Sequence, residues 1–377
     1  MTRSLQDIIR HSWCASIATL SLTLLTPASI AGTLPPTLGS NLVQGYIQPS
    51  MQHFQETAHQ LNQRLQAWCP KPSAAGAETI HDAFAEVVRA WSRIEFLRFG
   101  PLVAATRFER IYFWPDPRGI TLRQVQGLLA GAEPIPNAEA LASHSVAVQG
   151  LPALEYVLYR QGGILAIGAQ ATPDQESSTL SADFDGACAY ATSVSGNLAS
   201  VGAELVQAWS EEGPYGKQFS NPTPDSPLYR SPQEVAAEAI KALSTGLQFA
   251  HDIKLMPVLG KGFKQAKATR APFWRSGLST EAMAASVEGM LQFYQAGGYI
   301  YSDDETWIDQ NLRDELKRGV DNFKSLRQPM QQLTEGEDSY RRLTLAALLL
   351  ENAKSIVDQR MAPAFGVRLG FNALDGD

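Results

Sequence analysis

Apolar side chains recur along most of this chain at alternating steps of four and three residues, which is the spacing of helices packed in bundles. The most regular run covers residues 47–68, and a second run starts near residue 78. The apolar line of the second run leads on to Arg98, two positions before a Gly-Pro pair at 100–101 that closes the helix. The pattern predicts two long helices and places an arginine at the end of the second stripe, where a snorkelling side chain is the ordinary interpretation.

The same spacing returns in the rest of the chain and defines the fold class. Long helical runs cover 184–209, 232–255, 280–296, 303–326 and 338–361, and shorter helical pieces lie around 103–111, 122–129 and 139–143. No alternating run is long enough to demand a sheet. We therefore expect an all-α protein of two tandem helical-bundle domains, at 32–212 and 232–377, joined by a proline-rich connector at 213–231.

One carboxylate lies inside the apolar face of a predicted helix within 148–160. Gly150 ends the preceding segment, and Pro152 suits the first turn because its fixed φ fits a helix and its missing N–H costs nothing there. Glu155 then falls in the stripe that leucines 151, 154 and 158 form. Because an unpaired buried charge is costly, we expect Glu155 to have a cationic or metal partner, or to border a cleft.

Two loops, at 112–119 and 270–276, combine aromatic and charged side chains with prolines that fix the backbone. Loops hold functional residues more often than helices do, so these side chains are candidates for one shared site. The candidates are Trp114, Asp116, Arg118, Trp274 and Arg275.

Charged groups on rigid loops tend to converge, which gives Glu155 a set of expected neighbours. We expect Arg98 or Arg275 to lie closest to it, and the apolar C-terminus with Asp375 to dock against the body. A ligand-binding cleft between the bundles would explain such a cluster, and so would a structural ion-pair network that holds the bundles together. The sequence leaves these two interpretations open.

The N-terminus has the pattern of a secretory signal peptide, residues 1–31. Two arginines precede an apolar core at 13–25 that is too short to span a membrane comfortably, and small residues offer a cleavage site after Ala31. An uncleaved anchor is the alternative. Cleavage would remove two arginines and one aspartate and change the formal net charge from −7 to −8. That charge argues against nucleic acid or an anionic membrane as the main partner, and no transmembrane segment would remain.

Two cysteines, Cys69 and Cys188, would remain after such cleavage. In an exported protein a remaining pair is most simply a disulfide. A two-thiolate metal site is the alternative, although no histidine or further cysteine lies nearby in the sequence. The pair therefore favours a disulfide formed in an oxidising compartment.

Five separated motifs, taken together and in this order, resemble the imelysin family of bacterial envelope proteins. They are R-F-G-P at 98–101, W-P-D-P-R at 114–118, Q-G-L-P-A-L-E-Y at 149–156, P-F-W-R-S at 272–276 and L-G-F-N-A-L-D-G-D at 369–377. The resemblance implies an all-helical fold of two bundle-like domains, a location in the periplasm or at the cell surface, and an association with iron uptake. It also implies iron-uptake envelope proteins as partners, and iron or another divalent metal as a candidate cofactor.

The hallmark of that family, G-x-H-x-x-E, is altered in this chain. Gly150 and Glu155 match it, but Pro152 stands at the histidine position and offers no imidazole. Residues three apart on a helix share a face, so the intact hallmark would let a nitrogen and a carboxylate reach one ion. Glu155 is the only motif-matched metal ligand that this chain keeps, and the loss favours binding or assembly over catalysis.

Three functions can be compared on these residues. The favoured one is a non-catalytic envelope protein associated with iron uptake, which binds a ligand or partner in a cleft between two bundles. A metallopeptidase would need a ligand set such as H-E-x-x-H, and the histidines here are scattered. A structural or scaffold protein of the envelope is the third possibility. Besides the loop side chains, the candidate cleft residues are Gly150, Pro152, Glu155, Arg98 and Asp375.

Overall fold

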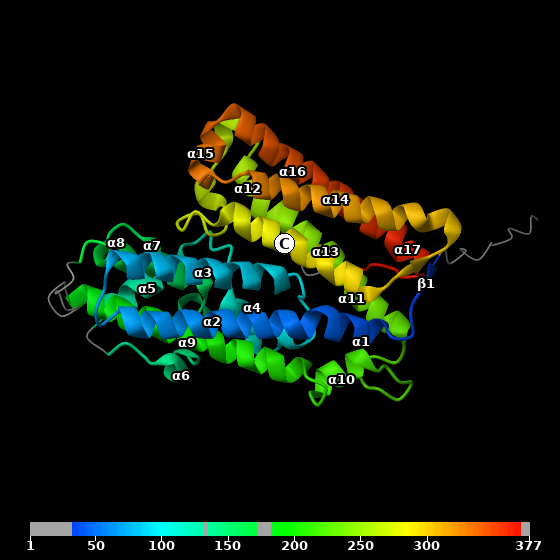
Figure 1. The fold of residues 1–377 in the computed structure, drawn as a ribbon, viewed down its shortest axis with the longest axis horizontal. Helices are drawn as coiled ribbons and strands as arrows, with labels where there is room; N and C mark the ends of the chain where they lie inside the picture. Colours follow the sequence, from blue (N-terminus) through cyan, green and yellow to red (C-terminus); the bar gives the residue numbers. More distant parts are fainter. Residues whose placement is uncertain (1–31, 132–133, 172–181, 371–377) are drawn as a thin grey trace, which may run out of the picture.

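The computed structural model describes residues 32–131, 134–171 and 182–370 (Figure 1). The predicted signal peptide, Asp375 and the expected docking of the C-terminal residues lie outside the described part of the chain. Helices dominate, and the one pair of strands in the described ranges is two residues long on each side, so the all-α prediction is confirmed. Strand β1 (Gly32–Thr33) runs antiparallel to β2 (Ile300–Tyr301).

Three long helices, α2, α3 and α9, lie side by side in the first half of the chain (Figure 1). The seam predicted at 47–68 is the buried face of α2, where Phe54, Leu61 and Leu65 have no exposed surface. The elements of this half are α1 (Leu38–Leu42), η1 (Val43–Ile47), α2 (Gln48–Trp68), α3 (Ala74–Ile94), η2 (Gly100–Leu102), η3 (Ala104–Thr106), α4 (Arg107–Ile111), α5 (Ile120–Ala130), α6 (Ala138–Leu141), η4 (Val146–Val148), α7 (Leu151–Tyr159), α8 (Ile164–Gly168), α9 (Ala182–Trp209) and α10 (Pro214–Ser220).

The second half forms another group around α13, α14 and α16 (Figure 1). Its elements are α11 (Pro232–Gln248), η6 (Phe249–Leu255), α12 (Met256–Leu259), η7 (Phe263–Gln265), η8 (Ala268–Arg270), α13 (Ser279–Gly297), η9 (Asp303–Glu305), α14 (Thr306–Ser325), α15 (Met330–Glu335), α16 (Glu337–Ile356), η10 (Val357–Met361) and α17 (Ala362–Ala364). Within the described ranges, no helix has both the length and the apolar character that crossing a membrane requires.

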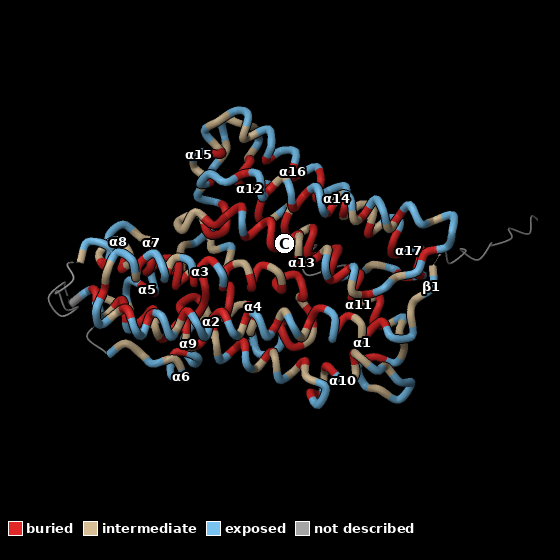
Figure 2. The backbone as a smooth tube through the Cα atoms, in the orientation of Figure 1, coloured by how far each residue is buried: buried red, intermediate tan, exposed pale blue. Residues whose placement is uncertain are grey.

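The two groups meet where α3 packs against α13. Buried residues from both groups belong to one continuous hydrophobic cluster, and Figure 2 shows the buried faces turned toward each other. An ion pair of 2.8 Å between Arg93 and Glu288 spans the same contact. The segment at 213–231, expected to be a connector, contains the short helix α10, which packs against α1 and α9. The two-domain division and its boundaries stay a prediction.

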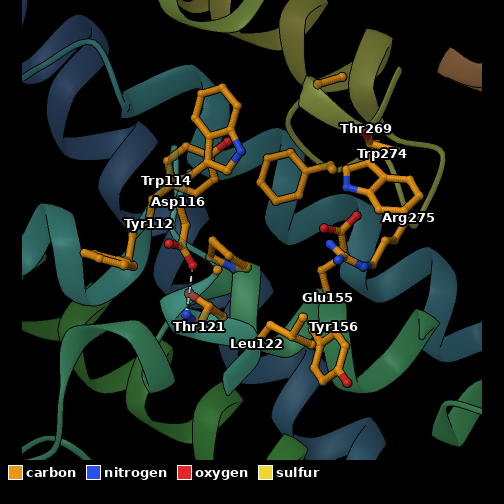
Figure 3. Close-up of a pocket in the computed structure, with 15 residues that line it drawn as sticks. Tyr112, Trp114, Asp116, Thr121, Leu122, Glu155, Tyr156, Thr269, Trp274 and Arg275 are labelled. Atoms are coloured by element: carbon orange, nitrogen blue, oxygen red, sulfur yellow. Dashed lines mark hydrogen bonds between the residues drawn. The ribbon is translucent and has the colours of Figure 1, made fainter. Parts of the chain in front are cut away.

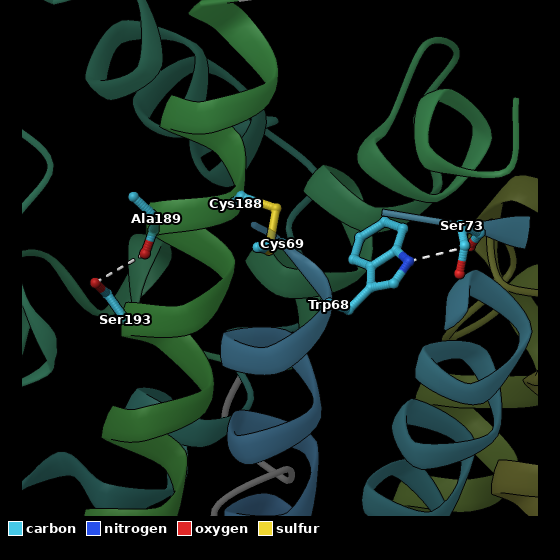
Figure 4. The surroundings of a disulfide bond; sticks show 6 residues. All are labelled: Trp68, Cys69, Ser73, Cys188, Ala189 and Ser193. Carbon is cyan, nitrogen blue, oxygen red and sulfur yellow. Dashed lines mark hydrogen bonds between the residues drawn. A yellow bond between two sulfur atoms is a disulfide. The ribbon is translucent and has the colours of Figure 1, made fainter. Parts of the chain in front are cut away.

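A disulfide between Cys69 and Cys188 joins the end of α2 to the beginning of α9 (Figure 4), so the prediction from the cysteine pair is confirmed. The residues are 119 positions apart in sequence. Next to it, the Trp68 indole N–H donates to the Ser73 carbonyl oxygen over 3.1 Å, and Ser73 caps α3 through the Gly76 N–H. The disulfide and these bonds hold α2, α3 and α9 together at one end.

Candidate ligand-binding site

A cavity of about 190 Å³ lies where loops from the two halves of the chain meet (Figure 3). One wall comes from the loop after α4 and from α5 and α7, and the other comes from the loop before α13. Aromatic rings make up much of the lining. The lining residues are Tyr112, Phe113, Trp114, Asp116, Gly119, Thr121, Leu122, Pro152, Glu155, Tyr156, Thr269, Ala271, Phe273, Trp274 and Arg275.

Helix α7 carries Glu155 to this cavity. Gly150 is its N-cap, and Pro152 lies in the first turn, as the sequence predicts. A Cβ added to Gly150 would lie 2.3 Å from the carbonyl oxygen of Ile111, so only glycine lets the end of α4 approach the start of α7 this closely. Gly150 therefore shapes the wall of the cavity and does not line it.

Glu155 is buried, with 4% of its surface exposed, and it borders the cavity. Its Oε1 accepts two hydrogen bonds from Ser276, one from the backbone N–H at 2.9 Å and one from the hydroxyl at 2.8 Å. Burial raises the pKa of Glu155 above its ordinary value, while the hydrogen bonds from Ser276 and the positive charge of Arg275 oppose that rise. The carboxylate thus ties α7 of the first half to a loop of the second half.

Arg275 is the cation whose charge acts on Glu155, which agrees with one of the two neighbours expected from the sequence. Its guanidinium carbon lies 4.5 Å from the ring centre of Trp274 and 5.6 Å from that of Tyr156. Among the residues that the structure describes, no hydrogen bond or ion pair occupies the Arg275 guanidinium. Its donors are therefore available at the cavity (Figure 3).

Arg98, the other expected neighbour, does not meet Glu155. Helix α3 ends at Ile94, one turn before the predicted end, and the chain after it leaves the apolar line on which the prediction rests. The Arg98 guanidinium lies over the rings of Phe108, at 4.1 Å, and Phe249, at 4.8 Å. Arg98 packs behind the cavity and is not part of its lining.

Asp116 and Arg118 have separate roles in the loop before α5. Both oxygens of Asp116 accept from the start of that helix. Oδ1 accepts from the Ile120 N–H at 2.9 Å. Oδ2 accepts from the Thr121 N–H at 2.8 Å (Figure 3). Asp116 therefore acts as a helix cap that fixes this wall. The Arg118 side chain is exposed and does not line the cavity, although its carbonyl oxygen accepts a hydrogen bond from Arg123.

The aromatic residues of the two loops stack on one another across the junction. The Tyr112 ring lies 5.7 Å from Trp114 and 5.4 Å from Phe273, both in stacked geometry. Burial and the charges of Glu95 and Glu155 raise the pKa of Tyr112 well above its ordinary value, so its phenol stays protonated at neutral pH. Within the described residues, the Tyr112 hydroxyl has no hydrogen-bond partner.

A buried ion pair lies behind Tyr112. Lys254 and Glu95 are 0% and 1% exposed, and the ammonium donates a hydrogen bond to Glu95 Oε1. The Lys254 nitrogen also lies 5.9 Å from the ring centre of Tyr112. Burial lowers the pKa of Lys254, and the charge of Glu95 opposes that shift. The pair joins the end of α3 to η6 of the second half.

Sequence reasoning did not select Ser276, Tyr156, Glu95 or Lys254 as site residues. Ser276 directly follows Arg275 in the P-F-W-R-S motif at 272–276. Its side chain is uncharged, so the sequence did not distinguish it as a site residue. Lys254 lies in η6, a π-helical segment whose wider turn shifts the side chains off the 3.6-residue spacing. Periodicity alone therefore could not place Lys254 in the core.

The side chains at the cavity do not form a metal-ligand set. Pro152 has no donor atom, Asp116 has both oxygens engaged by backbone N–H groups, and Glu155 Oε1 accepts twice from Ser276. In the parts of the chain that are described, no three His, Cys, Asp or Glu side chains gather as a metal site would require. Iron or another divalent metal is therefore not assigned to this cavity.

The chain belongs to the imelysin family, because the family model Peptidase_M75: Imelysin matches residues 47–357. It is similar in fold to an imelysin-like protein from Psychrobacter arcticum 273-4, with a TM-score of 0.69, 19% identity, and coverage of 91% of this chain and 100% of the other. It is also similar to an iron-regulated protein A precursor from Parabacteroides distasonis ATCC 8503, with a TM-score of 0.62, 13% identity, and coverage of 87% and 96%. Comparison with curated proteins finds no match.

Proposed function

We propose that this protein is a non-catalytic member of the imelysin family, associated with iron uptake at the cell envelope, which binds a ligand or partner at the cavity between its two helix groups. The observation that carries the proposal is the cavity itself. Trp114 and Trp274 reach it from opposite halves of the chain, and Arg275 brings donors that no described residue occupies. Arg275 is partly buried, and a purely structural junction would be expected to pair such a cation with an acceptor of the protein.

The association with iron rests on the family and on one structural neighbour. The protein from Parabacteroides distasonis is named as iron-regulated, and the fold of this chain is similar to it. At 13% identity that likeness supports the fold alone, so the iron association is a proposal for this chain.

We also propose export to the periplasm or cell envelope, with cleavage after Ala31. The disulfide between Cys69 and Cys188 supports this location, because such bonds persist in oxidising compartments and are rare in the cytosol. Mass determination of the mature N-terminus checks it, and a chain that keeps residues 1–31 would support the uncleaved anchor.

A metallopeptidase is disfavoured by the chemistry of the site. A peptidase of that kind needs a metal held by several ligands and an activated water. Here proline replaces the histidine of the hallmark, and the carboxylate oxygens of Asp116 accept hydrogen bonds from backbone N–H groups. Casein cleavage that a chelator abolishes would contradict the non-catalytic proposal.

Growth under iron limitation tests the proposed function. A strain of the source organism that lacks the gene is complemented with wild type, with Trp274→Ala, or with Trp307→Ala. Trp307 is an exposed tryptophan on α14, away from the cavity, so it serves as a matched control. We expect wild type and Trp307→Ala to restore growth, and Trp274→Ala to fail while its export and Tm stay normal. Full restoration by Trp274→Ala would leave a scaffold as the better description.

A further inference from the structure

We propose that the ligand of this cavity is a small planar carboxylate, about the size of a single ring, bound by the Arg275 guanidinium between the indoles of Trp114 and Trp274. The inference rests on the proposed function and names its ligand class. It is based on the hydrogen bonds at the cavity. Carboxylate oxygens of the lining accept from protein donors, whereas several N–H and O–H groups of the lining have no acceptor among the described residues.

The acidic groups at the cavity wall are used within the protein. Asp116 accepts from two backbone N–H groups, and Glu155 accepts from the N–H and the hydroxyl of Ser276. A cationic ligand would have to compete with these donors for both oxygens of Asp116 and for Oε1 of Glu155. The geometry therefore does not favour a metal ion or an ammonium group at this position.

The free groups are donors. The Arg275 guanidinium has five N–H groups in a planar fork, and none of them meets an acceptor among the described residues. The indole N–H groups of Trp114 and Trp274 likewise have no acceptor within the described ranges. A guanidinium fork matches the two oxygens of a carboxylate, and charge-assisted pairs of this kind are the stronger hydrogen bonds.

Two buried hydroxyls at the lining extend the same pattern. Tyr112 and Thr121 are 1% and 8% exposed, and neither hydroxyl has a partner in the described part of the chain. Both can donate, because a phenol with a raised pKa and an aliphatic hydroxyl are protonated at neutral pH. Apart from the carboxyl groups of Asp116 and Glu155, the polar side chains of the lining can therefore donate to an acceptor.

The size and the walls of the cavity define the rest of the ligand. A dry engineered cavity of about 150 Å³ holds one benzene ring, so about 190 Å³ accommodates one ring with a carboxylate. A macrocycle such as haem exceeds this volume. Rings that flank the space favour a flat ligand that stacks on them, and Arg275 already lies against Trp274, where it can meet the charged end.

Titration calorimetry of the purified full-length protein tests this inference with benzoate as the probe. Benzamide has the same shape without the charge, phenyltrimethylammonium carries the opposite charge, and cyclohexanecarboxylate lacks the flat ring. We expect benzoate to bind, benzamide and cyclohexanecarboxylate to bind at least about tenfold more weakly, and phenyltrimethylammonium not to bind. Equal binding of benzoate and benzamide, preferred binding of the cation, or no binding of benzoate would overturn the inference.

Two arginine variants assign the binding to the cavity. Arg275→Gln removes the charge, and we expect it to weaken benzoate at least about tenfold. Arg118→Gln removes an exposed arginine from the neighbouring loop and should leave the affinity unchanged. Arg275→Lys keeps the charge but loses the planar fork of N–H donors, and we expect it to bind benzoate with intermediate affinity. This variant tests the assignment if Arg275→Gln does not fold. Unchanged affinity in both Arg275 variants would overturn the assignment.

The outcomes separate this inference from the proposed function. If benzoate fails to bind but Trp274→Ala still abolishes growth under iron limitation, the ligand class is wrong and the function stands. If benzoate binds as expected but Trp274→Ala restores growth, the ligand class stands and the association with iron uptake is wrong.

Discussion

Ser276 donates two hydrogen bonds to one oxygen of Glu155, although 121 residues separate them in sequence. These bonds bring the helix with the altered hallmark against the loop that carries Trp274 and Arg275. In this chain, the hallmark carboxylate is held by protein donors from the other half. Its role in the structure is to join the two walls of the cavity.

The burial of Glu155 makes the stability of the protein depend on pH. Because its folded pKa is raised, the folded state binds its proton more tightly than the unfolded state does. The resulting stabilisation is fully present below the ordinary pKa of 4.5 and is lost as pH rises through the higher folded value. We therefore expect Glu155→Gln to flatten the fall in Tm from pH 4.5 upward, measured by circular dichroism.

Glu56→Gln is the control for this experiment, because Glu56 is exposed on α2. Its Tm profile should follow that of wild type across the same pH range. If Glu155→Gln gave the wild-type profile as well, desolvation of Glu155 would not be the source of the pH dependence.

The buried pair of Lys254 and Glu95 predicts a strongly unequal response to single and double substitution. Lys254→Met leaves Glu95 buried without its cation, and we expect a loss of about 3–5 kcal/mol in the free energy of unfolding. The double variant Glu95→Leu/Lys254→Met removes both charges and should recover most of that loss. Urea denaturation of the single and double variants measures both quantities.

Lys324→Met provides the comparison at an exposed pair. Lys324 contacts Glu288 at 2.8 Å, but its side chain is 55% exposed, so the pair is screened by water. We expect a change of about 0–1 kcal/mol. A similar cost for Lys254→Met would mean that water reaches the inner pair.

The disulfide predicts a large dependence of stability on redox state. A bridge over 119 residues restricts the unfolded chain, and the loop-entropy relation gives about 5 kcal/mol for a loop of this length. Urea denaturation with and without a reductant should show a loss of this order for wild type. The Cys69→Ala/Cys188→Ala variant should match reduced wild type and should not respond to the reductant, whereas a response would point to another thiol.

Two glycine substitutions test the close approach at the start of α7. Gly150→Ala places a methyl group 2.3 Å from the Ile111 carbonyl oxygen, and we expect a loss of about 1–3 kcal/mol. Gly127→Ala lies within α5, where a Cβ would meet nothing within 4 Å, and should stabilise by up to about 1 kcal/mol. Equal effects of both substitutions on urea midpoints would show that the Ile111 backbone can move aside.

The sequence by itself determined the helices and the buried position of Glu155. Apolar spacing is a local property that repeats over many turns, so the long helices are predicted from it with little dependence on their partners. Short helices contain too few turns for such a repeat, and among them the sequence singled out α4 and α6 but not α1, α8, α10 and α15. The cysteine pair predicted the disulfide because the third cysteine, Cys14, lies in the predicted signal peptide.

Only the tertiary structure decided which cation meets Glu155. Arg98 and Arg275 were equal candidates in sequence, but α3 ends before Arg98, and the loop before α13 brings Arg275 to the carboxylate. The same meeting of distant loops supplies Ser276 and forms the cavity. Such contacts depend on where each helix ends and how the two halves pack, and no local pattern in the chain records that geometry.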